Sequence, residues 1–191
     1  MDSFANGEHN MTAQEPTFTK HSAPQQVIDL VARFKEQRAD YKIGRYNETQ
    51  LRRDFLDPFF EALGWDVSNR KNLSEKYREV VHEMSVEVDG AAKAADYAFQ
   101  SGGGTLFFLE AKKPAVNIET SAEAAFQIRR YGWSAHLKLS LLSDFEQLAV
   151  YDCRPKPSHS DPAHVGRLNI FSYDEYISKW DEIHALFSYE A

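Results

Sequence analysis

A short apolar run that ends abruptly in charge is the feature that most constrains how this sequence can fold. Leu106–Leu109 is apolar at every position, and Glu110 and Lys112 follow at once. Side chains along a strand alternate between its faces, so a run that is apolar on both faces predicts a strand in the middle of a sheet. Charged groups at the end of a buried strand cost free energy unless they are paired or bind a ligand. The run therefore predicts a central strand over residues 105–112 with a functional site at its end.

Two further strands are expected just before this one. Residues 94–99 form a short strand that carries Asp96, and Ser101–Gly104 supplies a glycine-rich turn. Residues 80–88 alternate between apolar and polar side chains and end at Asp89-Gly90, which is a turn signal. Three strands joined by short turns predict an antiparallel meander, and its second turn brings Asp96 beside Glu110.

Helices are expected on both sides of the meander. The first covers residues 24–41. The second begins at Asn47, kinks at Pro58 and ends at Gly64. The remaining elements are a helix over residues 118–136, strands over 138–143 and 147–151, a loop over 154–167, an edge strand over 168–171 and a last helix from Ser172. A strand, a long helix and another strand indicate a parallel pairing. The prediction is an α/β fold with a mixed central β-sheet, an antiparallel meander plus a parallel strand, flanked by helices.

Length and composition indicate one domain of a cytoplasmic protein. Residues 1–23 are polar without an apolar period and are expected to be a disordered leader, so that 24–191 form the domain. The single cysteine, Cys153, suggests a reducing compartment, and the sequence has neither a membrane span nor a secretory signal. A net charge of -7 argues against a free-standing, non-specific DNA binder.

The charged residues at the strand ends have the form of a divalent-metal phosphodiesterase site. The carboxylates of Asp96 and Glu110 and the carbonyl oxygen of Ala111 are hard ligands that suit Mg²⁺, with Mn²⁺ as a substitute. A metal in this place polarises a phosphate oxygen and lowers the pKa of a bound water. Lys112 points the same way as Glu110, where it would orient that water or stabilise the negative transition state. The competing interpretation is surface decoration of an edge strand, which the apolar run disfavours.

Asp96 together with Glu110-Ala111-Lys112 resembles the motif of the PD-(D/E)XK nuclease superfamily, with Ala95 in place of the proline. The superfamily core has a helix, three antiparallel strands, a helix and a strand, which matches the predicted order. More narrowly, residues 25–191 resemble the N-terminal nuclease domain of type IIG restriction-modification enzymes and, more loosely, that of type I restriction R subunits. The stretches that carry this resemblance are Asn47–Trp65, Ala95–Ala98, Phe108–Pro114, Trp180–Glu182 and Phe187-Ser188.

The resemblance implies roles for residues on two helices. Glu48 matches a helix-borne acid that completes the metal shell, although a first-turn glutamate is also favoured by the helix dipole alone. Gln127 and Tyr131 match the Gln-x-x-x-Tyr motif of nucleases similar to the RecB group, and their i, i+4 spacing places both on one helix face. There they would position the scissile strand or the lysine, unless they are an ordinary amphipathic pair. Arg129 and Arg130 lie beside this face and are expected to touch phosphate.

The resemblance also implies a function: a Mg²⁺-dependent DNA endonuclease domain of a restriction-modification system. Methyltransferase, specificity or motor domains, of which this sequence carries no motif, would then read the DNA sequence. One alternative is a non-catalytic, nuclease-like module that binds DNA or protein, which the intact Asp96, Glu110 and Lys112 disfavour. The other is a repair or recombination exonuclease, which the Gln-x-x-x-Tyr helix keeps open.

Overall fold

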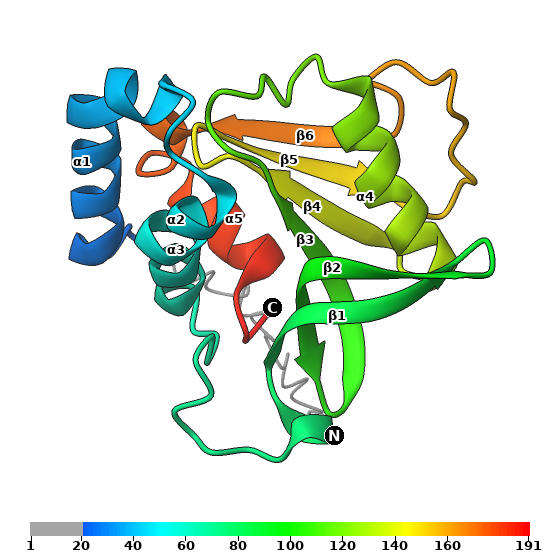
Figure 1. The fold of residues 1–191 in the computed structure, drawn as a ribbon. Coiled ribbons are helices and arrows are strands. Elements are labelled where there is room, and N and C mark those ends of the chain that lie inside the picture. Colours follow the sequence, from blue (N-terminus) through cyan, green and yellow to red (C-terminus); the bar gives the residue numbers. More distant parts are fainter. Residues whose placement is uncertain (1–20) are drawn as a thin grey trace, which may run out of the picture.

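The computed structural model describes residues 21–191, which form a single six-stranded sheet with helices on both faces (Figure 1). The strands follow one another in space in the order of the sequence. They are β1 (Val80–Val88), β2 (Ala91–Ser101), β3 (Gly104–Ala111), β4 (Leu139–Ser143), β5 (Gln147–Asp152) and β6 (Arg167–Ser172). β3 and β4 are parallel and the other neighbours are antiparallel. The predicted meander, the parallel crossover and the mixed sheet are confirmed.

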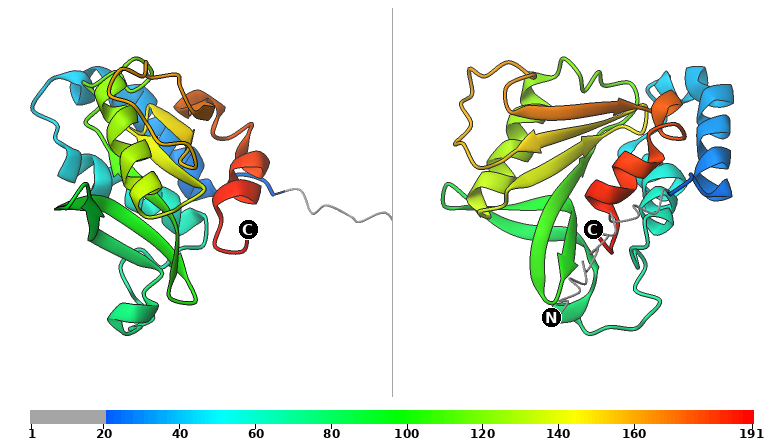
Figure 2. Two further views of the ribbon diagram at one scale, coloured as in Figure 1. Left: turned by 90° about the vertical axis from the view of Figure 1, so that its right-hand side faces the viewer. Right: turned by 180° about the vertical axis from the view of Figure 1, so that it is seen from behind.

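The helices form two layers around this sheet. The α-helices are α1 (Gln25–Lys42), α2 (Glu48–Leu51), α3 (Asp57–Ala62), α4 (Ala122–Ser134) and α5 (Trp180–Phe187). α1, α3 and α5 pack on one face, where Phe34, Phe59 and Trp180 meet Phe99 of the sheet in one buried cluster. α4 covers the other face alone (Figure 1), and Figure 2 shows both layers from the side and from behind. Each face of the sheet is therefore buried under helices, as α/β folds require.

β3 occupies the third position among the six strands, as its apolar run predicts. Phe107 and Leu109 belong to the cluster under α1, α3 and α5, whereas Phe108 belongs to the cluster under α4. Leu106, near the start of the strand, is 48% exposed. The run is thus apolar on both faces, and every residue of it except Leu106 is buried.

The second helical region begins at Asn47, as predicted, and then changes from an α-helix to a wider π-helical turn. Asn47 caps α2 through a hydrogen bond from Gln50 N, and the Gln50 side chain accepts from Asn47 N in return. A π-helical turn over Arg52–Leu56 then leads into α3, which has Pro58 at its start. The kink expected at Pro58 is present as this wide turn, because proline has no N–H for the helical ladder.

Two predicted helix boundaries are wrong. α4 begins at Ala122, four residues after the predicted Ile118, since Ser121 caps it by accepting a hydrogen bond from Ala124 N. The last helix does not run from Ser172. Ser172 does form its capping box, but with a 3-10 turn over Tyr173–Glu175, and α5 begins only at Trp180. Between them, the buried Tyr176 donates its hydroxyl to the Phe145 carbonyl at 3.0 Å, so tertiary packing and not helix propensity shapes this segment.

Most of the predicted leader, residues 1–20, lies outside the described residues. Residues 21–23 have neither helix nor strand, and His21 stacks on His184 of α5 with 3.9 Å between the ring centroids. Within residues 21–191, no helix combines the length and the apolar character needed to cross a membrane.

Candidate active site

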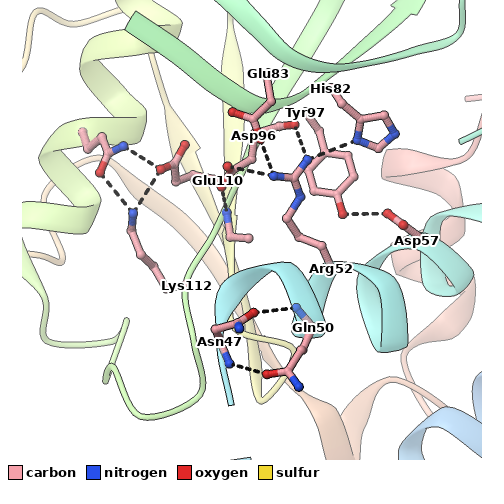
Figure 3. Close-up of polar contacts among 12 residues, drawn as sticks. Asn47, Gln50, Arg52, Asp57, His82, Glu83, Asp96, Tyr97, Glu110 and Lys112 are labelled. Carbon is pink, nitrogen blue, oxygen red and sulfur yellow. Dashed lines mark hydrogen bonds and ion pairs between the residues drawn. The ribbon is translucent and has the colours of Figure 1, made fainter. Parts of the chain in front are cut away.

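The middle of β2 and the end of β3 bring Asp96 and Glu110 together. Tyr97 of β2 is opposite Leu109 of β3, and this antiparallel register places Asp96 at the end of β3. There, the backbone N–H of Ala111 donates a hydrogen bond to Asp96 Oδ2 at 2.7 Å (Figure 3). Burial raises the pKa of the Asp96 carboxyl, although this hydrogen bond works in the opposite direction.

Glu110 is buried at this edge of the sheet, with 5% of its surface exposed. Its Oε1 accepts hydrogen bonds from Lys112 Nζ at 3.0 Å and from Gln127 Nε2 at 2.5 Å, whereas its buried Oε2 has no partner. Burial, with the nearby charge of Asp96, raises the pKa of Glu110 to about 7. One of the two carboxylate oxygens of Glu110 is therefore buried without a hydrogen-bond partner.

Lys112 points to the same side as Glu110, as strand alternation predicts. Its ammonium group lies between Glu110 Oε1 and Gln127 Oε1, at 3.0 and 3.1 Å. Burial is the largest single influence on the pKa of Lys112 and lowers it, but the charge and hydrogen bond of Glu110 and the charges of Glu48 and Asp96 together raise the pKa. Glu48, at the start of α2, contributes to the same rise, so its carboxylate lies near enough to act on the lysine.

Gln127 connects α4 to this end of β3. Its amide nitrogen donates to Glu110 while its amide oxygen accepts from Lys112, and the nitrogen also lies 3.3 Å from the hydroxyl of Tyr131 one turn later. The predicted placement of Gln127 and Tyr131 on one helix face is confirmed. α4 can approach so closely because a Cβ at Gly132 would lie 2.4 Å from Cys153 Sγ, a space that only glycine leaves open.

The two arginines of α4 form ion pairs with carboxylates of other segments. Arg129 is 2% exposed and its Nη1 pairs with Asp161 of the loop before β6 at 2.8 Å. The expected contact of Arg129 with phosphate stays a prediction, and the burial of this guanidinium against the protein's own loop counts against it. Arg130 is partly exposed and pairs with Asp89 of the β1–β2 turn at 2.6 Å.

Arg52 and Glu83 complete the site and were not expected from the sequence. Arg52 lies over the ring of Tyr97, its Nη1 is 3.3 Å from Asp96 Oδ1, and its Nη2 donates to the Asp96 carbonyl at 3.1 Å. Glu83 pairs with the same guanidinium at 2.5 Å (Figure 3). The backbone of Glu83 has a φ of 52°, a left-handed conformation that interrupts β1 opposite Asp96. The pair Arg52-Arg53 was the only sequence signal for this contact, and the alternation of β1 concealed Glu83.

The donor set fits a divalent cation in its chemistry. Asp96 and Glu110 supply carboxylate oxygens from adjacent strands, and the unpartnered, buried Oε2 of Glu110 is the atom that a cation would satisfy. Among residues 21–191, no three His, Cys, Asp or Glu side chains gather in an arrangement that could hold a metal. The inclusion of Glu48 and of the Ala111 carbonyl in a metal shell therefore stays a prediction.

The sequence was also compared with known proteins. No protein-family model matches it, and no solved structure matches significantly. The type II restriction enzyme and methyltransferase RM.Eco57I of Escherichia coli is 41% identical over 168 residues, which are 87% of this chain and 17% of that enzyme. The chain is homologous to a segment of a restriction enzyme and methyltransferase.

This homology confirms the resemblance to restriction-modification enzymes. The chain spans about a sixth of the length of RM.Eco57I. The α/β architecture, with its mixed sheet and two helical layers, is consistent with a restriction-endonuclease-like fold. Membership of the PD-(D/E)XK superfamily stays a prediction.

Proposed function

We propose that this chain is the DNA-cleaving domain of a restriction-modification system, a metal-dependent endodeoxyribonuclease that hydrolyses phosphodiester bonds. The observation that carries the proposal is the cluster of Asp96, Glu110 and Lys112 at the end of β3, where Gln127 bridges Glu110 and Lys112. Homology to a restriction enzyme and methyltransferase supports the same assignment.

Each residue of the cluster has a part in this proposal. Asp96, Glu110 and the carbonyl of Ala111 would hold Mg²⁺ or Mn²⁺, with Glu48 as a further ligand. The bound ion supplies polarisation of the phosphate and a lowered pKa for its water. Lys112 keeps its proton on Nζ and donates hydrogen bonds toward the water and the phosphate oxygens that become more negative.

Gln127 would act by positioning the two charged groups. One amide contacts both Glu110 and Lys112, so it fixes the carboxylate and the ammonium group relative to each other. Tyr131 limits the rotation of that amide through its hydroxyl. In an isosteric Gln127→Glu variant, a carboxylate oxygen would replace the N–H that Glu110 accepts from, and the two acids would repel each other.

The sequence of the DNA would be read elsewhere. The chain carries a net charge of -7, which disfavours general binding to DNA. The related segment is only 17% of RM.Eco57I, so further domains would supply specificity and methylation.

The proposal is tested by incubating the chain with supercoiled plasmid and with linear DNA in the presence of Mg²⁺, Mn²⁺ or EDTA, alone and fused to a DNA-binding domain. Lys112→Ala should reduce cleavage by about 100-fold or more, because it removes a donor that acts on the transition state. Lys113→Ala removes the same charge from the next position and should leave cleavage nearly unchanged.

Three outcomes would change the assignment. No metal-dependent cleavage by either form of the chain would refute catalysis and favour a non-catalytic module that binds DNA or protein. Degradation of linear DNA without nicking of closed circles would favour the exonuclease. Equal activity of the Lys112→Ala and wild-type chains would remove the lysine from the mechanism.

A further inference from the structure

A cavity opens beside Gln127 on the surface of α4. It has a volume of about 460 Å³. Its lining residues come from α4, β2 and the loop before β6, and include Lys93, Phe126, Gln127, Arg130, Tyr131 and His159. Gln127 and Tyr131 belong to the candidate active site as well, so the cavity adjoins the place where the proposed scissile phosphate would lie.

An aromatic platform forms one part of this cavity. The rings of Phe126 and His159 are 3.9 Å apart between centroids and inclined by 32°. Phe126 is partly buried on α4, while His159 is exposed on the loop that approaches it. His159 lies over Phe126, and because His159 is exposed, its outer face offers a flat surface on which a nucleobase can stack.

Basic side chains form the other part. Lys93 is exposed on β2, and the guanidinium of Arg130 lies 5.7 Å from the centre of the Phe126 ring. Asp89 holds Arg130 in this position, and the buried Nε of Arg130 has no hydrogen-bond partner. Glu123 also lines the cavity and Asp89 pairs with Arg130, so among residues 21–191 Lys93 is the cation of this lining that no ion pair engages. Positive charge beside an aromatic platform suits a ligand that combines a planar base with a phosphate.

We infer that this cavity binds a nucleotide of the DNA strand adjacent to the scissile phosphate. The base would stack on the outer face of His159, which Phe126 supports from behind, and its phosphate would lie against Lys93 and Arg130. The inference rests on the proposed nuclease function, because Gln127 and Tyr131 connect the cavity to Glu110 and Lys112. It assigns to a net acidic chain a local basic contact with its substrate.

Binding of DNA tests the inference separately from cleavage. The probe is a fluorescein-labelled 30-base-pair duplex with single-stranded ends, whose unpaired bases are free to stack on a side chain. Its anisotropy is measured against the full chain in Ca²⁺ at several salt concentrations. Lys93→Ala should weaken binding and reduce the slope of log affinity against log salt by about 1, as expected for one lost phosphate contact. His159→Ala should weaken binding about fivefold or more and leave the salt slope unchanged, because stacking releases no counterions.

Lys156→Ala provides the matched control. Lys156 is exposed on the same loop as His159, but it lies over Trp133, outside the cavity lining. Its replacement removes the same charge as Lys93→Ala and should alter neither affinity nor salt slope.

The outcomes separate this inference from the proposed function. Plasmid cleavage that depends on Lys112, together with unchanged DNA affinity in Lys93→Ala and His159→Ala, would overturn the cavity assignment and leave the nuclease intact. Weaker binding in both variants of a chain that never cleaves DNA would keep the cavity and overturn catalysis. If Lys156→Ala weakened binding as much as Lys93→Ala, general surface charge would explain the effect and the nucleotide site would be rejected.

Discussion

Asp144→Asn should stabilise the protein at alkaline pH, because this carboxyl group is buried in the turn between β4 and β5. Asp144 is 2% exposed, and its Oδ1 accepts a hydrogen bond from Gln147 N at 2.8 Å. Burial raises the pKa of Asp144 from 3.8 to about 8, against the opposing effect of that hydrogen bond. An asparagine keeps an acceptor oxygen in the same place but cannot ionise.

The sign and size of the effect follow from this pKa. The unfolded chain releases the Asp144 proton near pH 4, whereas the folded protein keeps it until about pH 8, so the folded state loses stability as the pH rises through that window. The interval between the two pKa values corresponds to about 6 kcal/mol, taking ~1.4 kcal/mol for each pKa unit, and about 5 kcal/mol of it is lost at pH 8, where the folded carboxyl is half ionised. The advantage of the variant should thus be near zero at about pH 4 and reach several kcal/mol at about pH 8.

Denaturation by urea, followed by tryptophan fluorescence at several pH values between about 5 and 8.5, measures the difference in unfolding free energy. Asp152→Asn is the control, since its hydrogen bond with Arg154 lowers the pKa of Asp152 and removal of that charge should bring no gain at high pH. A difference between Asp144→Asn and wild type that does not grow with pH would refute the reasoning. So would a variant less stable than wild type at about pH 8.

Two other substitutions test how the site is built. Arg52→Met removes the cation beside Asp96. The metal-free protein should therefore lose about 5 °C or more in Tm, which corresponds to a loss of ~2 kcal/mol in a chain of this length. Mg²⁺ should raise the Tm of this variant by more than it raises the Tm of wild type. Scanning calorimetry with and without Mg²⁺ measures both effects, and Arg53→Met, at an exposed position, is the control. Equal Mg²⁺-induced shifts of Tm in Arg52→Met and wild type would contradict the prediction. Gly132→Ala should destabilise the protein by about 1–3 kcal/mol despite the better helix propensity of alanine, because the new Cβ would lie 2.4 Å from Cys153 Sγ. Denaturant unfolding measures that loss. Adding Cys153→Ala to the Gly132→Ala chain should partly restore its stability. A gain in stability from Gly132→Ala alone would show that α4 moves away from the sheet without cost.

Much of the site could be predicted from local patterns. The apolar run before Glu110 identified a central strand, because a strand covered on both faces must be apolar at every position. The turn at Ser101–Gly104 then placed Asp96 beside that strand, and the i, i+4 spacing placed Gln127 and Tyr131 on one face of α4. These relations depend only on neighbours in the sequence, so they could be inferred before any contact between distant segments was known.

Other features needed the contacts themselves. Arg52 meets Asp96 across 44 positions of sequence, and Glu83 joins them from a strand whose alternation predicted nothing unusual. Arg129 follows Gln127 closely on α4 and carries the positive charge that a phosphate contact needs, yet its guanidinium forms an ion pair with Asp161 of the same protein. The direction in which a charged side chain points depends on the segments that pack over it. These segments are distant in the sequence, so local patterns do not predict that direction.

The sequence by itself thus determined the sheet, its crossover and the identity of the charged residues at the strand ends, because the periods of strands and helices and the chemistry of short turns are local. Only the tertiary structure decided that Glu110 keeps one buried oxygen without a partner, that Arg52 neutralises Asp96, and that Gln127 bridges the acid and the lysine. Burial, the loss of water around a charge and the distance between charges arise only when remote parts of the chain pack together. These quantities set the pKa values and the hydrogen bonds from which the site takes its chemistry.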